Sequence, residues 1–290
     1  MTLGGETLKK CFNVNGPCYP DENYMVNLDE RMIRIKELVD KQKYFVINRA
    51  RQYGKTTTLW ALRQYLKEEY NVLSTNFQRM SSAVFYDEHT FSREFANMIV
   101  RIIKNKKQEI SGFAKEDIQA LEKAAADHRI NMADLFYLLS SLCETSRKPV
   151  VLIIDEVDSA SNNQVFLDFL GLLRGYYLER KQTAIFHSVI LAGVYDIKNL
   201  KQKLRPDEVQ RYNSPWNIAA DFDIDMSFSV KDIEGMLSDY EKDHQTGMNI
   251  ERMSEAIYDY TSGYPYLVSR ICLLLDEQIA EKEGFESTKY

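Results

Sequence analysis

The residues best suited to chemistry are Gly54, Lys55 and Thr56, which directly follow a predicted strand and open a predicted helix. A glycine lets backbone N–H groups turn toward an anion, a lysine reaches nucleotide phosphates, and a hydroxyl ligates Mg²⁺. The helix N-terminus adds partial positive charge. The general phosphate-loop pattern has another glycine where Arg49 stands, so the triplet alone does not establish such a loop. Arg49 and Arg51 flank it and pair either with phosphate or with local carboxylates.

A pair of acidic residues lies about 100 residues downstream, where the apolar run at 150–154 ends in Asp155 and Glu156. Phosphoryl transfer uses a Mg²⁺-binding carboxylate at the carboxyl end of a sheet strand, and a base that deprotonates the attacking water. We therefore expect Asp155 to hold Mg²⁺ together with Thr56, and Glu156 to act as the base. The alternative is a strand that ends in a solvated acidic turn, and the upstream triplet disfavours it.

The elements that position these residues alternate between strands and helices. Continuous apolar runs predict buried strands, and apolar residues three and four apart predict helices. Strands are expected at 44–47, 72–77, 150–154 and 188–192, with a possible fifth, read from its alternating pattern, at 221–228; helices are expected at 28–39, 56–69, 164–180 and in three pieces between 91 and 143. This alternation predicts an α/β domain on a mostly parallel sheet.

Only helices are expected after residue 228. Ser229 and Asp232 form a capping pattern, a second helix covers 250–260, and Gly263 followed by Pro265 marks a helix end and a new start. We therefore expect three parts: an irregular lead-in at 1–26, the α/β domain at 27–228, and a helical domain at 229–290. The sequence leaves open whether the helical domain is cut from something longer.

The order of these parts resembles the AAA-like and STAND-related P-loop ATPases. Residues 48–59 look like the arginine-rich phosphate loop of the bacterial "predicted AAA-ATPase" families, in which the first glycine is commonly absent. Residues 189–196 resemble the sensor strand, 214–219 resemble another stretch of these proteins, and 261–265 resemble the turn through which a helical domain touches nucleotide. The resemblance covers about residues 20–280.

This resemblance implies a P-loop NTPase three-layer sandwich at 27–228, followed by a small helical lid or winged-helix-like domain. It implies ATP or ADP and Mg²⁺ as cofactors. It also implies an attached effector or nuclease-like C-terminal domain as a frequent partner, and it is compatible with an oligomer. We expect Lys55 to face solvent when no nucleotide is bound. The complete set of expected site residues is catalytic Glu156, nucleotide-binding Tyr53, Gly54, Lys55, Thr56 and Thr57, and metal-binding Thr56 and Asp155.

Two departures from the family pattern bear on catalysis. The predicted sensor strand ends at residues 192–194 without an Asn or Thr, which leaves Tyr195 or Asp196 as substitutes. No arginine stands out as a finger toward phosphate, and the nearest candidates are Arg205 and Arg211.

Composition narrows the functional classes. The chain has 290 residues, of which 44% are hydrophobic, so it contains enough apolar material for a large core. Its 37 basic and 43 acidic side chains give a formal charge of −6, which weakens the case for a whole-domain nucleic-acid binder. The four cysteines and four histidines lack metal-site spacing. Without a membrane-length apolar run or a recognisable signal peptide, we expect a cytoplasmic protein with no membrane partner.

These observations favour an ATP-binding P-loop protein that hydrolyses ATP with Mg²⁺ to switch or drive an attached effector. The missing sensor residue favours an alternative, a nucleotide-gated interaction module with negligible turnover. A DNA-remodelling ATPase of origin-recognition type is a third hypothesis, which the resemblance supports and the acidic balance opposes. The sequence leaves open the effector, the oligomeric state and any continuation past Tyr290.

Overall fold

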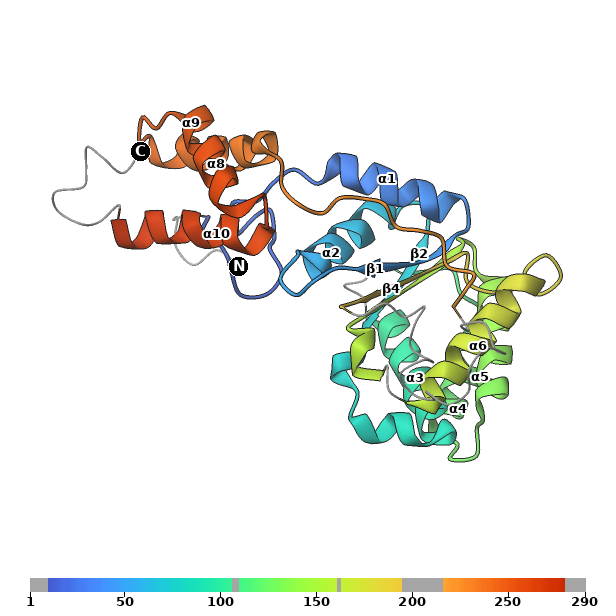
Figure 1. Cartoon of the computed structure of the whole chain (residues 1–290). Helices are drawn as coiled ribbons and strands as arrows, with labels where there is room; N and C mark the ends of the chain where they lie inside the picture. The colour runs from blue at the N-terminus through green and yellow to red at the C-terminus, as the bar shows by residue number, and fades with distance from the viewer. Residues whose placement is uncertain (1–9, 106–109, 161–162, 195–215, 280–290) are drawn as a thin grey trace, which may run out of the picture. The chain divides into compact units, whose positions relative to one another are not determined.

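The computed structural model describes residues 10–105, 110–160, 163–194 and 216–279 (Figure 1). Contacts divide the chain into two compact units. The sheet unit comprises Arg34–Ala50 and Leu62–Asp223, and the loop–helix unit comprises Met1–Ile33, Arg51–Ala61 and Ile224–Tyr290. The segment that contains the predicted phosphate loop therefore belongs to the same unit as the C-terminal helices.

A four-stranded parallel sheet forms the centre of the sheet unit. Its strands lie in the order β1-β4-β3-β2, so all four carboxyl ends point to one edge. Val46, Leu191, Ile154 and Thr75 share one row across the sheet, and Asp155 follows at the carboxyl edge. The predicted parallel sheet is confirmed, with strands β1 at Tyr44–Asn48, β2 at Asn71–Asn76, β3 at Val150–Asp155 and β4 at Ser188–Gly193.

Helices cover both faces of this sheet, which makes the predicted three-layer sandwich. Alternate strand residues such as Val46 and Leu152 join the large aromatic cluster on one face, whereas their neighbours such as Phe45 are buried toward the other. The C-terminal halves of α1 and α2 lie on that second face (Figure 1). The helices associated with the sheet unit are α1 at Asp29–Asp40, α2 at Lys55–Leu66, α3 at Glu88–Lys104, α4 at Lys115–Ala126, α5 at Met132–Thr145 and α6 at Gln164–Glu179.

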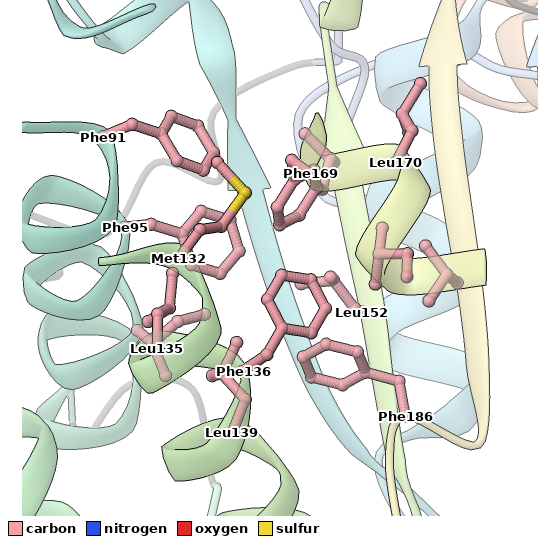
Figure 2. Close-up of a cluster of buried hydrophobic side chains, with 14 of the residues drawn as sticks. Phe91, Phe95, Met132, Leu135, Phe136, Leu139, Leu152, Phe169, Leu170 and Phe186 are labelled. Carbon is pink, nitrogen blue, oxygen red and sulfur yellow. The ribbon is translucent and has the colours of Figure 1, made fainter. Parts of the chain in front are cut away.

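The aromatic cluster holds α3, α5 and α6 against the sheet. Figure 2 shows Phe95 of α3, Phe136 of α5 and Phe169 of α6 converging beside Leu152. The ring centroids of Phe95 and Phe169 lie 5.2 Å apart, and those of Phe136 and Phe169 lie 5.6 Å apart. Burial of each such side chain stabilises the fold by roughly 1.5–3 kcal/mol. Short 3₁₀ turns complete the unit at Phe77–Arg79, Ser82–Tyr86 and Val157–Ala160.

The possible fifth strand, expected at 221–228, is not formed. Within 216–228, the described part of this segment, Ala220 alone forms a bridge to the sheet, where its N–H donates to the Tyr44 carbonyl at 2.8 Å. Phe222 and Met226 are buried between exposed acidic residues, so the alternation seen in the sequence is real. The prediction of a strand is wrong because alternating burial requires only an extended chain, whereas a strand also requires backbone pairing.

The loop–helix unit contains the predicted C-terminal helices and part of the N-terminal segment. Phe12 and Tyr24 pack on Tyr240, with ring centroids 5.3 Å from it in each case. The predicted cap is confirmed: Ser229 Oγ accepts from the Asp232 N–H, and Asp232 Oδ2 accepts from the Ser229 N–H. These helices are α8 at Val230–His244, α9 at Ile250–Thr261 and α10 at Pro265–Leu274, which continues into a π-helical turn at Leu275–Ile279.

Among the described residues, no helix is long and apolar enough to cross a membrane.

Candidate functional site

The loop between β1 and α2 has an unusual backbone. Gln52 has φ +60° and Gly54 has φ +72°, so both are left-handed, whereas Tyr53 between them is not. Alternating handedness turns successive N–H groups toward one side and forms a concave anion site. A side chain on Gly54 would meet no atom within 4 Å, so glycine is needed there for its backbone conformation. The loop can therefore present backbone donors to phosphate.

Lys55 is the first residue of α2, and its side chain is only 6% exposed. The expectation that it faces solvent is wrong, because sequence position does not reveal how far the surrounding chain covers the first helical turn. A buried ammonium must be compensated by polar or charged groups. Substitution of Lys55 therefore affects stability as well as any ligand. The next residue, Thr56, is exposed, as a metal-ligating hydroxyl would need to be.

The N-terminal segment contacts the first turns of α2. The Cys18 N–H donates to Thr57 Oγ1 at 3.1 Å. One residue further along, the Tyr19 ring meets the Trp60 ring edge-on, with centroids 5.1 Å apart. Thr57 Oγ1 therefore accepts from the N-terminal segment, while its O–H and its backbone N–H can each donate to the predicted nucleotide.

The turn between α9 and α10 contacts the phosphate loop directly. The Tyr264 hydroxyl donates to the Arg51 carbonyl at 2.5 Å, and the Tyr264 and Tyr53 rings lie 4.9 Å apart. The Tyr53 hydroxyl is 3.2 Å from Ser227 Oγ. The predicted helix end and new start are confirmed, because Gly263 follows α9 with φ +71° and Pro265 opens α10. Sequence reasoning did not identify Tyr264 beyond its place in this turn.

The two predicted catalytic carboxylates lie at the end of β3. Asp155 is 5% exposed, and its Oδ1 accepts from the Glu156 N–H at 2.9 Å, which orients the carboxylate. Glu156 has φ +54°, which is left-handed. The left-handed region costs a residue with a Cβ about 1–2 kcal/mol, and such strain gathers at functional sites.

The positions of the left-handed residues support this interpretation. Among the described residues, five non-glycine side chains have positive φ. Gln42, Gln245 and Ser262 follow the ends of helices, where this conformation is a common cap. Gln52 and Glu156 instead follow the carboxyl ends of β1 and β3. Backbone strain outside helix ends therefore occurs at the two loops predicted to carry the chemistry.

At the end of β4, where the predicted sensor strand lacks an Asn or Thr, the backbone contacts a carboxylate from the turn after β3. Asp158 Oδ2 accepts from the Val194 N–H at 2.5 Å. A Cβ on Gly193 would lie 3.0 Å from both Asp158 carboxylate oxygens, so a polar side chain would crowd this contact. The Asp158 carboxylate therefore occupies the space that a side chain at Gly193 would need. Sequence reasoning missed Asp158. The other predicted candidates, Tyr195, Asp196, Arg205 and Arg211, lie outside the described residues.

Arg49, at the position of the missing glycine, contacts the segment that follows the last strand. Its guanidinium lies over the Phe222 ring at 5.4 Å and donates to the carbonyls of Asn48 at 2.8 Å and Phe222 at 3.3 Å. These contacts attach the extended 221–223 segment to the end of β1. Arg49 therefore holds the start of the loop between β1 and α2. This role is additional to the pairing with phosphate or carboxylate expected from the sequence.

The remaining titratable groups do not suggest another reactive centre. Within the described part of the chain, no group of three or more His, Cys, Asp or Glu residues is arranged to hold a metal ion. Cys11, Cys18, Cys143 and Cys272 are free thiols. Burial raises the pKa of Cys272 to about 12, so this thiol is not a nucleophile near neutral pH.

The structure thus places the predicted residues in two groups. Residues 53–57 belong to the loop–helix unit, and Asp155 and Glu156 belong to the sheet unit. Within the sheet unit, β1 and β3 are parallel, so the strand that leads into the phosphate loop ends at the same edge as Asp155.

Comparison with known proteins agrees with the α/β fold. The sequence pattern of the family described as AAA-like domain matches residues 17–284. No curated protein matches the chain. The Walker-type ATPase PabY2304 of Pyrococcus abyssi has a TM-score of 0.61 at 14% identity, covering 92% of this chain and 71% of its own. The ORC1 protein of Aeropyrum pernix, solved in complex with DNA, has a TM-score of 0.48 at 12% identity, covering 90% and 62%. The first likeness shows a shared fold.

Proposed function

The chain belongs to the AAA-like domain family, and from this premise we propose that it binds ATP at Gly54, Lys55 and Thr56 and hydrolyses it slowly to switch or drive an attached effector. The observation that carries the proposal is the alternating backbone at Gln52 and Gly54, directly before a helix that begins with Lys55. Inward N–H groups, a helix N-terminus and a lysine together form a donor set for an oligophosphate.

The residues present also fit Mg²⁺. The exposed Thr56 hydroxyl and the Asp155 carboxylate are oxygen ligands of the kind that Mg²⁺ prefers, and we propose that they hold it. When bound, Mg²⁺ would neutralise charge on the phosphates. The Asp155 carboxylate already accepts from the Glu156 N–H, which restrains the orientation of this side chain.

We assign the proton transfer to Glu156. Its carboxylate would accept a proton from the attacking water, and its left-handed backbone sets the direction in which the side chain leaves β3. Tyr53 and Thr57 contribute through their backbone N–H groups, and the Thr57 hydroxyl, which accepts from the Cys18 N–H, still has a proton to donate.

A second candidate function is a nucleotide-gated interaction module with negligible turnover. It is favoured by the end of β4, where Gly193 carries no side chain and the Asp158 carboxylate accepts from a backbone N–H. A site that orients water poorly would bind nucleotide well and hydrolyse it badly. Binding and turnover therefore have to be measured separately.

The binding test is a thermal shift with Mg-ATP. At a hundredfold excess over Kd, ATP should stabilise the fold by about 2.7 kcal/mol, a melting shift of roughly 5–10 °C. Lys55→Ala should abolish the shift, and Lys181→Ala, an exposed lysine outside the loop, should retain it. Because Lys55 is buried, each shift is measured against the same variant without nucleotide. An unchanged shift in Lys55→Ala would remove the phosphate-loop assignment.

The turnover test uses Glu156→Gln, which keeps the shape of the side chain and removes the base. Hydrolysis should fall by about 10²- to 10⁴-fold, with ATP affinity nearly constant. Wild type with no turnover above this variant, but with ATP bound, would leave the gated module as the function.

A further inference from the structure

Tyr264 contacts the backbone of the phosphate loop next to left-handed Gln52. The Tyr264 hydroxyl donates to the Arg51 carbonyl at 2.5 Å, and that carbonyl belongs to the peptide joining Arg51 to left-handed Gln52. A hydrogen bond at this oxygen restrains the orientation of the whole peptide plane. Left-handed backbone is unfavourable for a residue with a Cβ, so the hydrogen bond from Tyr264 helps to keep Gln52 in this conformation.

The same tyrosine contacts the loop on the other side of Gln52. The Tyr264 and Tyr53 rings lie 4.9 Å apart at 49°, and the Tyr53 hydroxyl is 3.2 Å from Ser227 Oγ. The residues before and after Gln52 are therefore both held from the C-terminal part of the loop–helix unit. Two attachment points fix a short segment far better than one.

The turn that carries Tyr264 is itself tightly held. Gly263 has φ +71°, and a Cβ there would lie 2.0 Å from the Phe228 carbonyl oxygen. The Gly263 carbonyl accepts from the Phe228 N–H at 2.8 Å, and the Gly263 N–H donates to Thr261 Oγ1 at 3.2 Å. Pro265 then begins α10. Burial, with smaller contributions from Tyr53 and Tyr266, raises the pKa of Tyr264, so its hydroxyl remains a donor at neutral pH.

We propose that Tyr264 is a positioning residue for the phosphate loop: it holds the Arg51 carbonyl so that the N–H groups after it face the phosphates. This rests on the nucleotide binding proposed above. Tyr264 acts through the backbone of the loop and needs no contact with the nucleotide. The turn between α9 and α10 thereby determines how well the loop is formed.

The first test needs no nucleotide, because trypsin cleaves after Arg51. In the full chain, Tyr264→Phe keeps the ring and removes the hydrogen bond, so the exposed Arg51–Gln52 bond should open more often. Cleavage there should be about 2- to 10-fold faster, relative to cleavage after Arg129, whose side chain is 91% exposed. Tyr260→Phe, at a tyrosine that is 86% exposed, is the matched control and should cleave as wild type. Equal cleavage in Tyr264→Phe and wild type would overturn the proposal.

The second test measures nucleotide affinity by calorimetry. Tyr264→Phe should raise the Kd for ADP and for ATP by about 2- to 10-fold, and Tyr260→Phe should leave both unchanged. If turnover is measurable, KM should rise by a similar factor while kcat changes less than about twofold, because the loop binds ground state and transition state alike. A lower melting temperature with unchanged Kd would mean a merely structural role and would overturn the proposal.

The two tests separate this proposal from the function on which it rests. If wild type binds no nucleotide, or Lys55→Ala binds equally well, the proposed function fails, and the proteolysis result still decides whether Tyr264 holds the loop. If wild type binds in a Lys55-dependent manner and Tyr264→Phe matches it in cleavage and affinity, only the role of Tyr264 fails.

Discussion

Glu156 offers a test in which stability and activity should change in opposite directions. It is left-handed with φ +54°, and so is Gln42, which follows the end of α1 and has the same φ. We therefore compare Glu156→Gly with Gln42→Gly. Both remove a Cβ from a residue with φ +54°, but only Glu156→Gly removes the proposed base.

The expected change in stability follows from two opposing effects. Releasing a Cβ from the left-handed region stabilises the folded state by about 1–2 kcal/mol. Glycine also gives the unfolded chain more freedom, which costs about 0.5–1 kcal/mol. Each variant should therefore be more stable than wild type by up to about 1.5 kcal/mol. For a chain of this size, 1 kcal/mol raises the melting temperature by about 2–4 °C.

The assay combines urea unfolding of the nucleotide-free protein with ATP hydrolysis at saturating Mg-ATP. Hydrolysis should fall by about 10²- to 10⁴-fold in Glu156→Gly and stay at the wild-type rate in Gln42→Gly. Glu156→Gln should lose hydrolysis without gaining stability, because glutamine keeps the strained Cβ. The three variants thus separate the backbone contribution of this position from its chemistry.

Two results would refute this reasoning. Wild-type turnover in Glu156→Gly would show that the base lies elsewhere. A loss of more than about 1 kcal/mol in Glu156→Gly, with the expected gain in Gln42→Gly, would show that the glutamate side chain holds the fold together. In that case, the left-handed backbone is a consequence of packing and not of function.

Three further predictions follow from single positions. Asp155→Asn should weaken ATP binding in Mg²⁺ and leave binding in EDTA unchanged, measured by calorimetry; equal losses in both would contradict a metal role. Gly263→Ala should destabilise the protein by more than about 2 kcal/mol in urea unfolding, because its Cβ would lie 2.0 Å from the Phe228 carbonyl oxygen, whereas Gly171→Ala in α6 should not, since nothing lies within 4 Å there. Burial lowers the pKa of His187 below its ordinary 6.5, so the unfolded chain takes up this proton first, and stability should fall as pH drops below 6.5. His187→Gln should show a shallower fall in urea unfolding at pH 5–6.5, and an identical slope would refute the assignment.

Much of the sheet unit could be predicted from sequence because its signals are local. The apolar run of β3 and the spacing of Phe91 and Phe95 in α3 report burial within a few residues. Residues 221–228 mark the limit of this reasoning. Their alternation correctly indicates which side chains are buried, but a strand also needs a run of backbone partners on a neighbouring strand. Beside this segment the described structure shows only the isolated bridge between Ala220 and Phe45.

The same contrast between local signals and distant contacts applies to the predicted site. The identities of Gly54, Lys55 and Asp155 carried enough information to propose roles for them, because phosphate and metal chemistry favours those residue types. The burial of Lys55 and the left-handed backbone of Gln52 and Glu156 could not be predicted, since neither side chain favours that conformation by itself. Such conformations exist only where the surrounding structure imposes them.

The loop–helix unit shows what imposes one of them. The backbone around Gln52 is held by Tyr264 and by Ser227 through Tyr53, residues that lie more than 170 positions later in the chain. Within the same unit, Cys18 holds Thr57 from the N-terminal side. Contacts between residues so far apart in sequence leave no local pattern. A phosphate loop could therefore be predicted from residues 54–56, whereas the contacts that shape the loop could not. The phosphate loop and the first turn of α2 are therefore held by contacts from three distant segments of the chain.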